Sequence, residues 1–185
     1  MYVAIHAFLY FFSGQGFFFG SKGGRIRANS RLRVGLDFTI TMMINPKNLT
    51  GILAAVKGKN DFLILEMLFG SIKFSVDVGR GPITAVFKPK SQSFFCKDEW
   101  HEIHAMKAKN VVTLAVDKIS AQPGIGVPGV SSTDINDPLF LGGHTDPVSF
   151  NLDPEDANYF GYMKDIQIEG SPVTINEEDM FGDVS

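Results

Sequence analysis

The chain has 185 residues, of which 44% are hydrophobic and 20% charged, a composition typical of a globular protein with one domain and a sizeable core. Its formal net charge of -3 gives no basic surface of the kind that phosphate backbones require, so nucleic-acid binding is not expected. Cys96 is the single cysteine, which excludes a disulfide within the chain and a zinc site built on thiolates.

Residues 1–19 are aromatic and apolar, yet they do not have the pattern of a signal peptide or a membrane span. They lack a basic beginning, contain His6, and are interrupted by Ser-Gly-Gln-Gly at 13–16 before about 20 apolar residues have accumulated. We therefore interpret residues 1–16 as a linker or leading segment without membrane insertion. The folded domain is expected at 17–185.

Short segments with alternating apolar residues follow along the chain, separated by turn residues. Strand patterns occupy residues 36–44, 51–56, 83–87, 102–106, 111–117, 139–141 and 161–168. The clearest hairpin is 60–79, with a turn at 69–71, and a polar turn at 107–110 joins another pair of strands. Residues 121–130 are rich in Pro and Gly and are expected to be irregular. The sequence predicts an all-β protein, an antiparallel β-sandwich of the jelly-roll type.

One end of the central hairpin carries residue types that suit a hard cation. Asp61 stands where the first strand begins, and the main chain of Val78 leaves the second strand at the same end. Calcium prefers such a mixture of carboxylate and carbonyl oxygens. The polar loop 131–138 offers a second carboxylate, from either Asp134 or Asp137, although a loop with two aspartates is also typical of a solvated surface.

Other candidate sites have simpler explanations. His101 and His104 lie three apart on a strand and therefore point to opposite faces, where they cannot bind one metal. The acidic loop 153–156 lacks the glycine and the ligand spacing of an EF-hand. A glycosidase needs two carboxylates, and Glu66 and Asp77 are the only strand acids near the central hairpin that could form such a pair. Neither has a second acid two residues away on the same face of its strand.

Several stretches, in order along the chain, resemble laminin G-like domains. The resemblance is closest to the fifth, C-terminal G-like domain of laminin alpha chains of the alpha-1 or alpha-2 type. It covers nearly the whole chain, and it rests on the combination of residues 11–17, 34–37, 76–85, 96–101, 116–117, 134–143 and 160–165.

The resemblance implies a laminin G-like, concanavalin-like jelly-roll with one calcium ion at the rim. Carried over to the matching positions, the ligands are the side chains of Asp61 and Asp134 and the main-chain carbonyls of Val78 and Ser132. With only two protein carboxylates, calcium affinity is expected on the order of 10⁻⁴–10⁻³ M, as in other extracellular modules. Tyr162 stands where the family usually has a cysteine, so the customary disulfide, typically worth about 2–4 kcal/mol, is missing.

The function that the resemblance implies is a non-enzymatic adhesion module, secreted into the extracellular matrix of basement membranes. In the presence of calcium it would bind acidic or sulfated glycans, including heparin, sulfatide and glycans of the dystroglycan type. The basic residues that flank the rim in sequence, expected as glycan contacts, are Lys57, Lys59 and Arg80. The alternative is a structural terminal domain with a vestigial cation site, packed against a neighbouring laminin G-like domain.

Overall fold

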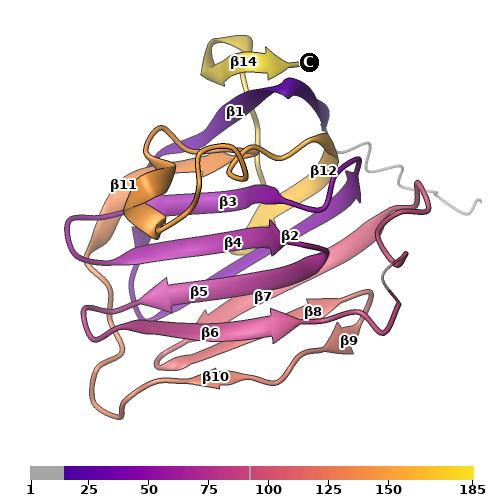
Figure 1. Ribbon diagram of the computed structural model, residues 1–185. Coiled ribbons are helices and arrows are strands. Elements are labelled where there is room, and N and C mark those ends of the chain that lie inside the picture. Colours follow the sequence, from indigo (N-terminus) through magenta and orange to yellow (C-terminus); the bar gives the residue numbers. More distant parts are fainter. Residues whose placement is uncertain (1–14, 92) are drawn as a thin grey trace, which may run out of the picture.

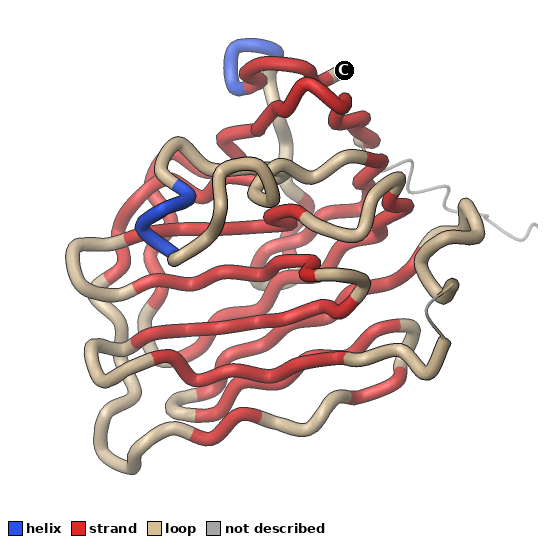
Figure 2. Tube along the Cα trace, in the orientation of Figure 1, coloured by secondary structure: helices blue, strands red, loops and turns tan. Residues whose placement is uncertain are grey.

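A computed structural model of the protein describes residues 15–91 and 93–185, without the side chains of residues 29 and 30. The described residues form strands joined by turns and loops, with two short 3₁₀ helices (Figure 2). In chain order the elements are β1 (Gly16–Val34), β2 (Asp37–Pro46), β3 (Gly51–Lys57), β4 (Phe62–Leu68), β5 (Ser71–Asp77), β6 (Pro82–Phe87), β7 (His101–Ala108), β8 (Val111–Val116), β9 (Ile119–Ser120), β10 (Gly124–Ile125), β11 (Ile135–Leu141), η1 (Pro147–Phe150), β12 (Gly161–Ile168), β13 (Ser171–Pro172), η2 (Glu177–Asp179) and β14 (Met180–Val184).

The strands form two packed layers that share one long strand. The order along the sheet is β10-β8-β7-β2-β12-β1-β11-β3-β4-β5-β6, with antiparallel pairing at each step. The beginning of β1 pairs with β12 in one layer, and its later part pairs with β11 in the other. Figure 1 shows β3 to β6 in front of β2, β7 and β8. The predicted antiparallel jelly-roll sandwich is therefore confirmed.

Alternating burial explains why these segments pair as they do. Along β7 the inward positions are His101, Ile103, Ala105 and Lys107, and the residues between them face outward. The central hairpin has the expected register, from Phe62 opposite Asp77 to Leu68 opposite Ser71. Its two-residue turn is made by Phe69 and Gly70, which both have positive φ angles, of 47° and 76°.

Two apolar clusters hold the layers in place. The larger one fills the space between the layers, and its fully buried members include Phe19, Phe38 and Phe74. The smaller one lies on the other face of β3 and β4, where Phe150 and Ala157 cover Ile52, Ala55 and Ile64. The segment that carries these two covering residues runs across the front layer (Figure 1).

Three expectations about element boundaries were wrong. The strand expected at 139–141 begins at Ile135, because Pro138 falls within a register shift against β1, where its missing N–H costs no ladder bond. The turn expected at 107–110 is shorter, since β7 continues to Ala108. The Pro- and Gly-rich segment 121–130 includes the short strand β10, which pairs with β8.

The expected leading segment falls mostly outside the described residues, which begin at Gln15. The Gln15 side chain both donates to and accepts from the main chain of Ile175, at 3.1 Å in each case, and β1 begins at Gly16. In the described part of the chain, no helix is long and apolar enough to cross a membrane.

Candidate metal centre

Asp61 lies at the end of a tight connection between β3 and β4. The Gly58 N–H donates to the Asp61 main-chain oxygen at 2.9 Å and closes this connection. The whole residue is only 8% exposed. One carboxylate oxygen, Oδ2, accepts the main-chain N–H of Asp134 at 2.9 Å. The connection therefore brings a nearly buried carboxylate against a segment that is 73 residues away in sequence.

Asp134 is the last residue before β11, and the turn between β1 and β2 holds the segment that carries it. The Thr133 hydroxyl donates to the Val34 carbonyl, and the Thr133 N–H donates to the Gly35 carbonyl at 3.4 Å. Asp134 itself is exposed. Together with Lys59, Asn60 and Asp61 it lines a small pocket of about 130 Å³.

The main chain after β5 reaches the same place. A Cβ atom added to Gly79 would lie 3.4 Å from Oδ1 of Asp61, so the 78–79 backbone adjoins the carboxylate oxygen that does not bind the Asp134 N–H. The Asp77 carboxylate shapes this turn by accepting the N–H groups of Gly79, Arg80 and Gly81 at 2.7, 3.2 and 3.2 Å. The structure thus brings together Asp61, Asp134 and the backbone next to Val78. Ser132 lies two residues before Asp134 in the same segment.

The charges at this rim suit a cation. Within the described ranges, no Lys, Arg or His forms an ion pair with either Asp61 or Asp134. A nearly buried carboxylate without a cationic partner is costly, and a bound metal ion removes that cost. No group of three or more His, Cys, Asp or Glu side chains could hold a metal in residues 15–91 and 93–185. A hard cation here would rely on two carboxylates and main-chain oxygens, which are ligands that calcium accepts.

The three basic residues expected as glycan contacts have different surroundings. Lys59 lines the Asp61–Asp134 pocket. Arg80 is exposed and lines a neighbouring cleft of about 360 Å³, with Val78 on its wall and Ile125 and Val127 at its edge. Lys57 lies over the rings of Phe62 and Phe150, at 4.9 and 5.8 Å, and so faces the outer side of the front layer.

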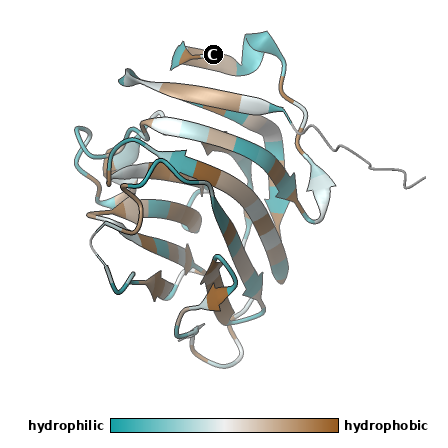
Figure 3. Ribbon diagram, turned by 90° about the vertical axis from the view of Figure 1, so that its right-hand side faces the viewer, coloured by the Kyte–Doolittle hydropathy of each residue, from teal (hydrophilic) through white to brown (hydrophobic). Residues whose placement is uncertain are grey.

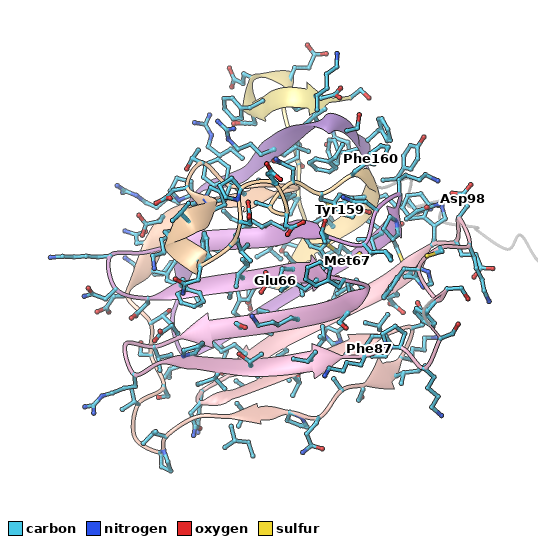
Figure 4. All side chains as sticks on the ribbon, in the orientation of Figure 1. Glu66, Met67, Phe87, Asp98, Tyr159 and Phe160 are labelled. Carbon is cyan, nitrogen blue, oxygen red and sulfur yellow. The ribbon has the colours of Figure 1, made fainter. Side chains whose placement is uncertain are left out.

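The rejected candidates have structural partners. Glu66 is buried on β4, where Figure 4 labels it, and forms an ion pair of 3.0 Å with Lys73 across the hairpin. His101 is buried and contacts Asp117 at 2.8 Å, whereas His104 is exposed, so the two histidines face opposite ways as expected.

One residue close to this rim was missed by the sequence reasoning. Lys107 was placed in a polar turn, but it is fully buried and inward-facing on β7. A signal was available, because Ile103 and Ala105 precede it at the same period-two spacing.

Comparison with known proteins places the chain in a family. The family model described as "Laminin G domain" matches residues 44–171, which is more than half of the chain. The chain is a laminin G domain. Laminin subunit alpha of Drosophila melanogaster is 29% identical over 174 residues, which cover 92% of this chain and 5% of that protein. Laminin subunit alpha-1 of Mus musculus is 29% identical over 166 residues, again with 5% of its length covered.

A solved structure supports the same fold. The mouse laminin alpha1 chain, domains LG4-5, superposes with a TM-score of 0.73 at 24% identity, over 92% of this chain and 46% of that one. The laminin G domain described here therefore spans about 5% of the curated relatives' length.

Proposed function

We propose that this laminin G domain is a non-enzymatic adhesion module of the extracellular matrix, which binds acidic glycans through a calcium ion at the Asp61–Asp134 rim. The observation that carries the proposal is the Asp61 carboxylate, which is nearly buried beside Asp134 and has no basic partner within the described residues. The relatives support the setting, since laminin alpha chains are extracellular matrix proteins.

The chemistry of binding follows from an incomplete ligand set. Asp61, Asp134 and the carbonyls of Val78 and Ser132 would supply four oxygens, whereas calcium takes six to eight. The remaining positions are open to water or to a carboxylate or sulfate group of a glycan. Lys59 at the pocket and Arg80 beside it would then contact other anionic groups of the same ligand.

A calcium titration of the metal-free domain tests the proposal, with Asp134→Asn in parallel. We expect binding on the order of 10⁻⁴–10⁻³ M in the wild type and none in the variant. Binding to immobilised heparin and hyaluronan is then compared in calcium and in EDTA, and we expect it to disappear in EDTA and in Asp134→Asn.

The possible results separate the two accounts of this domain. Binding to heparin that persists in EDTA would assign the glycan to the basic residues and overturn the role of calcium. Absence of calcium binding, together with an unchanged melting temperature in calcium, would favour a structural domain that packs against a neighbouring G-like domain.

A further inference from the structure

Lys107 occupies a position where a lysine is rarely found. It lies on β7, on the face that turns toward the interior, and its relative exposure is 0%. Lysine is almost never fully buried unless its charge is compensated, because an ammonium ion loses strong hydration there. Burial accordingly lowers the pKa of Lys107, an effect that the nearby charge of Asp37 opposes.

The ammonium group uses all three of its hydrogen-bond donors on main-chain carbonyls. Nζ donates to the oxygens of Gly35 at 2.9 Å, Leu36 at 2.6 Å and Ser131 at 2.7 Å. Gly35 and Leu36 form the connection between β1 and β2, whereas Ser131 belongs to the segment before β11. A single side chain therefore ties together two segments that lie about a hundred residues apart in sequence.

The segment that Lys107 binds continues to the rim. Ser131 is bound by Lys107, Thr133 is bound to Val34 and Gly35, and Asp134 donates its N–H to Asp61. Ser131 and Thr133 are thus held from the inside, and Ser132 and Asp134 are the exposed residues of the segment. Both exposed residues are expected ligands of the cation. Calcium requires its oxygen ligands at about 2.3–2.6 Å, so the position of this segment decides whether Ser132 and Asp134 can share an ion with Asp61.

We propose that Lys107 is a positioning residue of the rim site, which holds segment 131–134 so that Ser132 and Asp134 face the same cation as Asp61. The inference rests on the calcium site proposed above. A role in folding alone would appear as a loss of stability in Lys107 variants, because removing the ammonium group leaves the carbonyls of Gly35, Leu36 and Ser131 without these donors. An outer contact that orients ligands, in contrast, commonly changes metal affinity about 10- to 100-fold when it is removed.

The test uses Lys107→Met, which retains the length of the side chain and removes its donors. Lys73→Met is the matched control, because it also deprives a buried partner, Glu66, of a lysine. The first readout is amide hydrogen exchange in the absence of calcium. It is followed at Thr133, whose N–H donates to Gly35, and at Asp134, whose N–H donates to Asp61. We expect exchange about tenfold faster or more in Lys107→Met and unchanged in Lys73→Met.

The second readout is calcium affinity. We expect it to fall about 10- to 100-fold in Lys107→Met and to remain at the wild-type value in Lys73→Met. Exchange at Thr133 and Asp134 that matches the wild type would overturn the proposal. Faster exchange with unchanged affinity would also overturn it, because Lys107 would then be only a structural tie.

Failure of the calcium site itself is recognised separately. A wild-type domain that gives no calcium heat overturns the proposed function, whereas the exchange rates still report whether Lys107 holds the segment. Should Lys107→Met not fold, Lys107→Gln provides a milder comparison, because its shorter side chain has two N–H donors and cannot bind all three carbonyls. Wild-type exchange and affinity in that variant would likewise count against the proposal.

Discussion

Each end of the sandwich carries an aspartate, and the two carboxylates differ in their exposure and in their ion-pair partners. At the end opposite the rim, Asp98 is exposed (Figure 4) and accepts hydrogen bonds from the Lys47 ammonium and from the Asn45 side chain, the latter at 3.0 Å. These bonds lower the pKa of Asp98. Asp61 is nearly buried and forms no ion pair among the described residues.

The difference separates a carboxylate with a structural role from one that is available to a ligand. Asp98 already has a cation and an amide as partners, so a metal ion would have to displace them. Asp61 has one main-chain N–H on Oδ2, and the neighbourhood of Oδ1 is formed by the Gly79 backbone. Asp98 is thus the more exposed of the two carboxylates and also the one that already has side-chain hydrogen-bond partners.

The strongest test of this contrast compares Asp61→Asn with Asp98→Asn, which change the net charge equally at opposite ends. We expect Asp61→Asn to weaken calcium binding at least about tenfold, since ligand charge sets the affinity of such sites. Asp98→Asn should leave it unchanged, and asparagine tolerates the positive φ of 57° at that position. Calorimetric titration measures both.

Thermal unfolding adds a second reading of the same pair of variants. Calcium at about ten times its dissociation constant should stabilise the wild type by about 1.4 kcal/mol. The increase should vanish in Asp61→Asn and persist in Asp98→Asn. Equal calcium responses in the two variants would remove the distinction between the two ends.

The alternation of apolar residues was sufficient to predict the sandwich, because period-two burial is a local property of each strand. It also placed Asp61 and Val78 at one end of a hairpin, which is a short-range relation. The approach of Asp134 to Asp61 is a contact over 73 residues, and only family resemblance selected Asp134 over Asp137. In the structure the Asp137 carboxylate also lies at the β3–β4 connection, 3.5 Å from a Cβ atom added to Gly58, whereas Asp134 lines the pocket with Asp61.

Lys107 shows a second limit of the sequence. Lysines at the end of a strand usually belong to a polar turn, and the local pattern at 107–110 favoured that interpretation. The carbonyl groups that make its burial possible come from the β1–β2 connection and from Ser131. The local sequence of β7 cannot predict these carbonyl partners, because they come from distant parts of the chain.

A smaller effect is expected at the hairpin tip of the opposite end, which Figure 3 turns toward the viewer. Phe69 is 77% exposed and has a φ of 47°, a conformation that costs a side chain such as phenylalanine about 1–2 kcal/mol. Phe69→Asn creates Asn-Gly, the preferred pair for a two-residue turn with both φ angles positive. We expect the free energy of unfolding to rise by about 0.5–1 kcal/mol, measured by urea denaturation, with calcium affinity unchanged.

A change of calcium affinity in Phe69→Asn would show that the hairpin tip and the rim are energetically coupled. It would also weaken the use of the opposite end as a reference. A loss of stability would instead mean that the exposed ring makes contacts worth more than the strain of its backbone.

The smallest expected effect is a dependence of stability on pH, and it comes from His144. The ring packs edge-on against Phe140 and Phe150, with centroids 5.2 and 4.9 Å away, and Nδ1 accepts the Asp146 N–H at 3.0 Å. Burial lowers the pKa of His144; Asp146 opposes the shift, and Arg25 and Lys57 add to it.

The sign of the pH effect follows from that shift. Below about pH 6.5 the unfolded chain binds a proton at His144 more readily than the folded chain does, so stability falls as the pH decreases. We expect this part of the acid loss to be absent in His144→Gln and retained in His104→Gln, whose ring is exposed. Urea midpoints at pH 7.5 and 5.5 measure it. An identical acid loss in all three proteins would assign the effect to other groups, the rim carboxylates among them.

The pairing of β1 with β14 has a mechanical consequence. Phe18 and Ser185 exchange both of their main-chain hydrogen bonds, at 2.7 and 3.0 Å, where the two strands run antiparallel. Because such bonds stand perpendicular to the strands, tension applied between these two residues would load them one rung at a time, as in a zipper, and not in shear. The strand β14 would therefore peel away at low force, before the layers that hold Asp61 and Asp134 separate.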